Sequence, residues 1–168
     1  MRHSRNFWIA FALLCGAAAL DVANPCVGIL ALAHLALALA ALLGYRIMRG
    51  RARVLRDGSP DLSREREQHG AEAERLAREG IRRSISVMSR TYLGFCSILS
   101  ICTTVATCLL TMLGLDPEHG GTPMLPVQLA PFDAALDLWA LSAVMSVAAA
   151  VLLMAAGSDV RRWLHRLP

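Results

Sequence analysis

Four long apolar segments are separated by shorter polar ones along the chain. Residues 7–45 contain only three strongly polar side chains, and residues 93–115 and 138–157 contain no charged side chain. Uncharged stretches of about 20 residues are long enough to cross the hydrocarbon core of a bilayer as helices. The pattern predicts an all-α polytopic membrane protein with four transmembrane helices, and it excludes a soluble enzyme or a DNA-binding module.

The spans and the polar segments between them divide the chain into three parts. We place the spans at about residues 7–22, 26–45, 92–115 and 132–156. The parts are an N-terminal transmembrane hairpin with a basic cytoplasmic exit (1–57), a charged cytoplasmic helix (58–91) and a second transmembrane hairpin with an amphipathic basic tail (92–168).

The first span admits two interpretations. A basic leader, an apolar run over 7–20 and the small residues 17–19 also form the pattern of a cleaved secretory signal peptide. We favour an uncleaved helix that ends near Val22, followed by a tight turn through 21–24. Pro25 then begins the second helix, because proline fits the first turn, where its missing N–H would have no partner.

The second span carries a stripe of small residues that predicts close approach of another helix. The stripe consists of Ala33, Ala36, Ala40 and Gly44. Beyond it the helix continues into a basic face, for which we expect anionic lipid headgroups as ligands. We assign the same role to the basic residues of the C-terminal tail. These residues are Arg46, Arg49, Arg53, Arg56, Arg161, Arg162 and Arg166.

The charged segment is expected to be a helix that starts at Pro60 with Ser59 as its N-cap and can continue into the third span. Glu74 and Arg78 are spaced i, i+4 in the favourable order. One interpretation is a solvated helix that spaces two spans. The other is a short bundle or coiled coil with a second copy, along a weak apolar stripe that includes Leu76.

In the second hairpin we expect the fourth span to end at Gly157 and Ser158 to cap a separate tail helix on the inner membrane surface. Trp139 is predicted to be an anchor at the membrane interface. Asp133 and Asp137 lie one turn apart near the outer end of this span. They are candidates for a cation site, although a solvated helix start is the preferred interpretation.

The charge distribution predicts the topology. All 17 basic residues are Arg, and they lie in three segments together with eight of the 13 acidic residues. The region around Asp21 and the segment 116–137 hold the other five acidic residues and no Arg. Since Arg-rich short segments stay in the cytoplasm, both termini and residues 46–90 should be cytoplasmic, with a bacterial inner membrane as the default location.

His34 is the intramembrane ionisable candidate. An ionisable side chain at this depth suggests a function, such as a proton relay or a metal ligand shared with another helix. The preferred interpretation is a neutral His that bonds to a neighbouring helix. Cys96, Cys102 and Cys108 splay around their helix and cannot share one metal ion. The five Cys are interpreted as small buried hydrophobes. No catalytic, metal-binding or nucleotide-binding motif is present, so we expect no catalysis, no metal and no cofactor.

The third span has a polar face. At 100° per residue its hydroxyl side chains fall within one arc of the helix, and the fourth span offers a matching small-residue face. We expect the two faces to pack against each other, with position 104 opposite 146; the alternative is a pore-lining face. The residues of this face are Ser97, Ser100, Thr104, Thr107 and Thr111, matched by Ser142 and Ser146.

The function expected from these features is that of an accessory or assembly subunit acting through helix–helix contacts in the membrane. The alternative is a small homo-oligomeric channel or transporter lined by the polar face of the third span. The expected partners are the bilayer with its anionic lipids and other membrane subunits or copies of this chain, and not nucleic acid.

Overall fold

The chain folds into four long helices. The structure, a computed structural model, describes residues 5–27, 32–57, 60–115 and 130–166. The α-helices are α1 (Arg5–Ala23), α2 (Leu32–Asp57), α3 (Pro60–Gly114) and α4 (Ala135–His165), and a short 3-10 helix, η3 (Phe132–Ala134), precedes α4. Each of the four is long and apolar enough to cross a membrane. The predicted all-helical fold with four candidate spans is confirmed, and it indicates an integral membrane protein.

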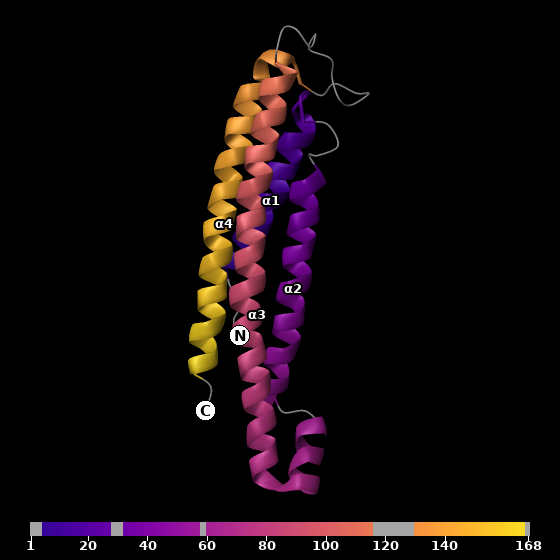
Figure 1. Cartoon of the computed structure of the whole chain (residues 1–168), viewed down its shortest axis with the longest axis vertical. Helices are drawn as coiled ribbons and strands as arrows, with labels where there is room; N and C mark the ends of the chain where they lie inside the picture. The colour runs from indigo at the N-terminus through magenta and orange to yellow at the C-terminus, as the bar shows by residue number, and fades with distance from the viewer. Residues whose placement is uncertain (1–4, 28–31, 58–59, 116–129, 167–168) are drawn as a thin grey trace.

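The helices form an up-and-down bundle (Figure 1). The neighbouring pairs are α1–α2, α2–α3, α3–α4 and α1–α4, so that α2 and α4 occupy opposite corners. The amide of Asn6 donates a hydrogen bond of 2.8 Å to Asp159, which joins the start of α1 to the last turns of α4. The two ends of the described chain therefore lie towards the same end of the bundle.

The apolar core is built from interlocking large and small side chains. The rings of Phe7 and Tyr45 stack with centroids 3.9 Å apart, and Leu14, Leu93 and Leu153 are buried around them. Part of the predicted small-residue stripe of α2 serves this packing. Gly44 lies against the ring of Tyr92, whose hydroxyl donates to the carbonyl of Ala40 at 2.8 Å.

The C-terminal tail differs from its prediction. Helix α4 does not end at Gly157 but continues without interruption to His165. Val160 and Leu164 are buried against Leu55 and Ile85, in a second apolar cluster at this end of the bundle. The prediction of a separate helix on the membrane surface is wrong, because the apolar side of the tail packs on extensions of α2 and α3.

The connection after α1 also differs from its prediction. Helix α1 continues through Asp21 to Ala23, and the N–H of Asn24 still donates to the carbonyl of Leu20 at 3.0 Å. The side chain of Asn24 then accepts from the N–H of Cys26 at 2.9 Å, and residues 25–27 form a turn. Pro25 therefore does not begin α2, because the side chain of Asn24 stabilises a turn at that point.

Helix α3 is continuous from the charged segment into the membrane span, with one break. Gly70 has φ 85° and ψ 177°, and the part of α3 before it folds back beside the rest (Figure 1). Arg78 forms the predicted ion pair with Glu74 at 2.8 Å, and Arg66 approaches Glu74 across the break at 3.8 Å. The segment before Gly70, which contributes Arg66, therefore pairs with the rest of α3 within one chain. A contact with a second copy stays a prediction.

We expect Gly70→Ala to weaken this fold-back by about 1–3 kcal/mol, because φ 85° with ψ 177° is a backbone region that is essentially restricted to glycine. Hydrogen exchange of amides 61–69 should become faster. Gly80→Ala is the matched control, since Gly80 is helical and nothing lies within 4 Å of its added Cβ. Equal exchange rates in the two variants would show that the break does not depend on glycine.

Some predictions lie outside the described residues. These are the N-cap at Ser59 and most of the Arg-free segment 116–137, of which the structure does not describe residues 116–129.

Candidate functional site

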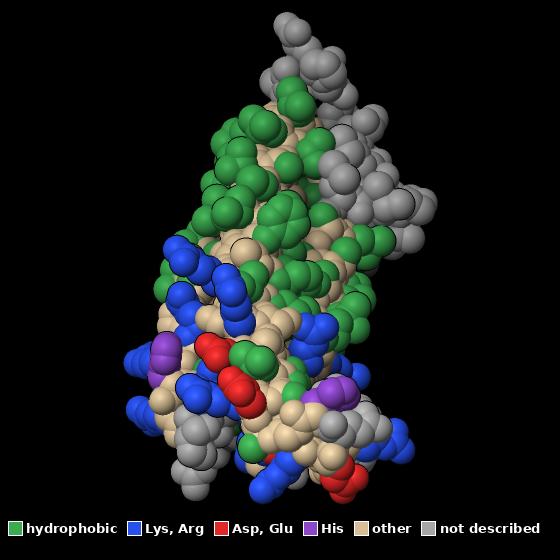
Figure 2. All heavy atoms as spheres, turned by 60° about the horizontal axis from the view of Figure 1, so that its bottom comes forward, with side chains coloured by type: hydrophobic (Ala, Val, Ile, Leu, Met, Phe, Trp, Pro, Cys, Tyr) green, Lys and Arg blue, Asp and Glu red, His purple; other side chains and the backbone are tan. Residues whose placement is uncertain are grey.

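Polar side chains are buried inside the bundle, whereas the face of its apolar half seen in Figure 2 is covered mainly by hydrophobic side chains. Polar atoms are costly in a membrane interior unless they are bonded, so a concentration of them needs a structural or functional reason. The buried polar residues are Asp21, Asn24, His34, Ser89, Ser97, Ser100, Thr104, Thr107, Thr111, Ser142 and Ser146.

The hydroxyl face of α3 lies against α4. Ser97 shares its hydroxyl proton between the carbonyl of Leu93 in its own helix, at 2.8 Å, and the carbonyl of Ala150 on α4, at 3.0 Å. Ser100 donates to the carbonyl of Ser146 at 3.1 Å. The register differs from the expected one by one turn, because Ser100 rather than Thr104 is bonded opposite Ser146.

The hydroxyl groups nearer the C-terminal end of α3 form hydrogen bonds mainly within their own helix. Thr104, Thr107 and Thr111 donate to carbonyls of the preceding turn of α3 at 2.8–3.0 Å. The carbonyl of Thr104 also accepts the indole N–H of Trp139 at 3.3 Å. Trp139 is half-buried and bonded to α3. Its role as an anchor at the membrane interface stays a prediction.

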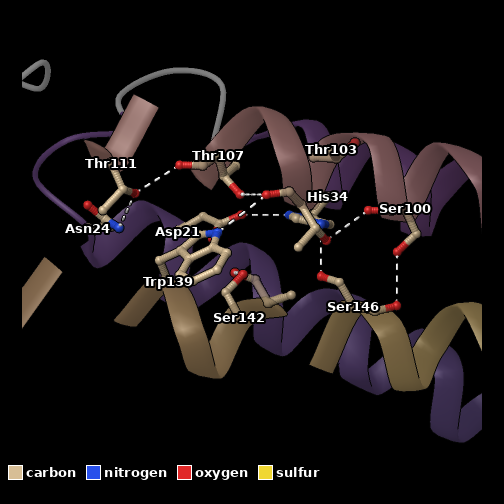
Figure 3. Close-up of polar contacts among 12 residues, drawn as sticks. Asp21, Asn24, His34, Ser100, Thr103, Thr107, Thr111, Trp139, Ser142 and Ser146 are labelled. Carbon is tan, nitrogen blue, oxygen red and sulfur yellow. Dashed lines mark hydrogen bonds and ion pairs between the residues drawn. The ribbon is translucent and has the colours of Figure 1, made fainter. Parts of the chain in front are cut away.

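A chain of three residues joins three helices in the interior (Figure 3). Oδ2 of Asp21 on α1 lies 2.6 Å from Nδ1 of His34 on α2, and Nε2 of His34 lies 2.9 Å from Oγ of Ser146 on α4. All three residues are fully buried. Because α2 and α4 occupy opposite corners, the imidazole crosses the centre of the bundle, and the bond from Ser100 to Ser146 connects α3 as well.

This position of Asp21 corrects the sequence interpretation. Asp21 was expected in the tight turn through 21–24, but it lies on the inward face of α1 with 0% exposure. Its second oxygen, Oδ1, is buried and has no hydrogen-bond partner within the described part of the chain. His34 is thus bonded across helices, as one of its two interpretations proposed, and one of its partners is an acid.

Asn24 completes the polar interior beyond the Asp–His–Ser chain. Its amide donates to Oγ1 of Thr111 and to the carbonyl of Ala135, both at 3.1 Å. Ser142 donates to the carbonyl of Ala17 at 3.4 Å. These contacts connect α1, α3 and α4.

The order Asp–His–Ser is also that of hydrolase triads, in which His accepts the proton of a nucleophilic Ser. Hydrolysis further needs free donors for an oxyanion and a path for the substrate. Ser146 is fully buried within α4, so its own N–H belongs to the hydrogen-bond ladder of the helix. Ser146 therefore lacks the open surroundings that a triad nucleophile has.

The outer candidates lie apart from this chain. Asp133 on η3 and Asp137 on α4 are exposed, and no group of three His, Cys, Asp or Glu side chains in the described residues could hold a metal ion. Cys26 and Cys96 are buried, in agreement with their interpretation as small hydrophobes, whereas Cys102 is exposed.

The candidate lipid-binding Arg residues lie at one end of the molecule, where Figure 2 shows Arg side chains below the hydrophobic surface. Arg49 and Arg161 are half-buried, and the other five are exposed. Arg162 forms an ion pair with Asp159 at 2.7 Å, so its guanidinium is partly neutralised.

No protein-family model, no curated protein and no solved structure matches this chain. We therefore infer its function from the geometry of the bundle.

Proposed function

We propose that this protein is an accessory or assembly subunit of the membrane that acts through helix–helix contacts. The observation that supports the proposal is the burial of the hydroxyl face of α3, with Ser97 and Ser100 bonded to carbonyls of α4. A face used in this way has little hydrogen-bonding capacity left for a solute. The hydroxyl groups of this face have their hydrogen-bond partners within a single copy of the chain.

The surface left for a partner in the apolar half is hydrophobic. Leu43, Leu109 and Val144 are among its most exposed side chains, with 60–67% exposure. Helices associate within a bilayer mainly by van der Waals packing, so such a surface suits other membrane helices as well as lipid.

The alternative function is a small homo-oligomeric channel or transporter lined by the polar face of α3. It requires α3 to turn away from α4 and to replace the bonds of Ser97 and Ser100. A conductance experiment separates the two functions.

We expect purified protein in a planar bilayer to give no ion conductance. A photo-cross-linker at Val144 should give one adduct of fixed mass in native membranes, and a linker at the buried Ala149 serves as the control. Conductance of the protein alone would contradict the subunit function and favour the channel.

We also propose that the Arg-rich end is cytoplasmic in a bacterial inner membrane and contacts anionic lipids there. Each exposed Arg near such a surface contributes about 1 kcal/mol of attraction. The gathering of Arg at one end of the bundle supports this orientation.

The orientation predicts that a reporter fused after Gly121 is active on the external side only. The reason is that segments without Arg are translocated while Arg-rich segments are retained. A fusion after Arg56 is the control and should be active in the cytoplasm. Cytoplasmic activity of the Gly121 fusion would reverse the topology.

A further inference from the structure

We infer that Asp21 and His34, assisted by Ser146, form an intramembrane proton-binding site. The inference goes beyond the proposed function and does not depend on it. Its ligand is a single proton, taken from a hydronium ion and returned to water, and no other bond forms or breaks. It rests on the geometry of the three side chains, on their burial and on the absence of a donor to Asp21 Oδ1 within the described residues.

The distances define which atoms can hold protons. Oδ2 of Asp21 and Nδ1 of His34 are 2.6 Å apart, which requires one proton between them, because two lone pairs would repel. At the other nitrogen, Nε2, the hydroxyl of Ser146 can donate to a bare nitrogen or accept from an N–H. The pair can therefore hold one proton or two with its heavy atoms in the same places.

Electrostatics favours two protons. With one proton the pair has a net charge of −1, and with two it is neutral. A net charge is expensive in the membrane interior, so the second proton lowers the free energy of the buried site.

Among the described residues, the neighbouring helices place no charged group beside the pair that could replace that proton. Towards the pair, α3 and α4 present hydroxyls, those of Ser100 and Ser146 among them, and α4 also presents the indole of Trp139 (Figure 3). In the described part of the chain, the pair has no ion pair with an Arg, and the nearest acid along α4, Asp137, is exposed.

Asp21 Oδ1 provides a second indication. A buried carboxylate normally accepts hydrogen bonds at both oxygens, and this oxygen has no donor within the described residues. An unbonded oxygen lowers the stability of the carboxylate and favours the neutral pair. Asp21 lies two residues before the end of α1, towards the end of the bundle opposite the Arg residues.

The test is the protonation of His34 Nε2. In both arrangements of the two-proton state, AspCOO⁻ with imidazolium or AspCOOH with imidazole, Nε2 carries a proton. In the one-proton state Nε2 is bare. Solid-state ¹⁵N NMR of His-labelled protein in lipid bilayers distinguishes an N–H from a bare nitrogen. His34→Gln identifies the signal among the five His.

We expect Nε2 of His34 to carry a proton and to lose it reversibly when the pH is raised. Asp21→Asn keeps the shape of the side chain and removes its charge, so this titration step should disappear. The control Asp137→Asn, at an exposed acid on α4, should leave the step unchanged. If Asp21→Asn does not fold, the wild-type titration decides alone.

Three results would overturn the inference. The first is an Nε2 that is bare at every pH, and the second is an N–H that never titrates, which would make the pair a purely structural contact. The third is a spectrum that responds to sodium ions at constant pH and not to pH itself, which would make the ligand a metal cation.

Discussion

His34→Ala should lower the free energy of unfolding by about 3–5 kcal/mol at neutral pH, because it leaves the carboxyl group of Asp21 buried without its partner. The same substitution removes the contact to Ser146, so α1, α2 and α4 lose their common link. Unfolding by SDS titration in mixed micelles measures the loss.

Two further variants separate the contribution of the Asp21–His34 contact to the free energy of unfolding from the contribution of ordinary packing. In Asp21→Ala/His34→Ala no buried acid remains, so the double variant should lose clearly less stability than the two single losses added together. Ser146→Ala should cost only about 1 kcal/mol, since it removes one hydrogen bond. Additive losses of Asp21 and His34 would show that the two side chains are not energetically coupled.

The second large effect concerns the contact of α3 with α4. Gly157→Ala should lower the free energy of unfolding by about 1–3 kcal/mol, because its Cβ would lie 2.8 Å from the carbonyl oxygen of Ser89. That oxygen belongs to the backbone of a helix, so the steric clash can be relieved only if α3 and α4 move apart. The hydrogen bonds of Ser97 and Ser100 to α4 would lengthen as well.

Gly94→Ala is the matched control. Gly94 is also helical and lies in the span of α3, but nothing lies within 4 Å of its added Cβ. The variant should be neutral or stabilised by up to about 1 kcal/mol, since alanine favours a helix over glycine. Equal losses in both variants would show that the close approach at Gly157 does not matter.

Length and hydrophobicity were sufficient to predict the four spans, because a helix must be about 20 apolar residues long to cross a bilayer. The hydroxyl arc of the third span was equally readable, since Ser97 to Thr111 recur at helical spacing. The exact register of this arc on α4 could not be predicted, because the backbone carbonyls of many residues of α4 could accept hydrogen bonds from the same hydroxyl groups.

Asp21 was misplaced because an acid at the end of an apolar run was taken as the start of a turn. The spacing of the apolar residues of α1 could have indicated that Asp21 faces the bundle. The buried residues of this helix are Phe7, Ala10, Leu14, Ala17, Ala18 and Asp21, so Asp21 continues the alternating spacing of three and four. A residue on that stripe faces the bundle whatever its polarity.

The same reasoning applies to the tail. Val160 and Leu164 continue the buried stripe of α4 beyond Gly157, whereas the sequence analysis took the glycine as a helix end. Glycine also allows the close approach of two helices, and only the contact with Ser89 distinguishes these roles.

The central claim is that the polar face of α3 is packed inside the bundle, and cysteine scanning in a Cys-free background tests it most directly. Cysteines at positions 97, 104 and 111 should resist aqueous thiol reagents, a cysteine at the exposed position 72 should react, and the pair 97–150 should cross-link on oxidation. Ready labelling along the whole face, without a 97–150 cross-link, would contradict the claim and show that this face lines a path for water.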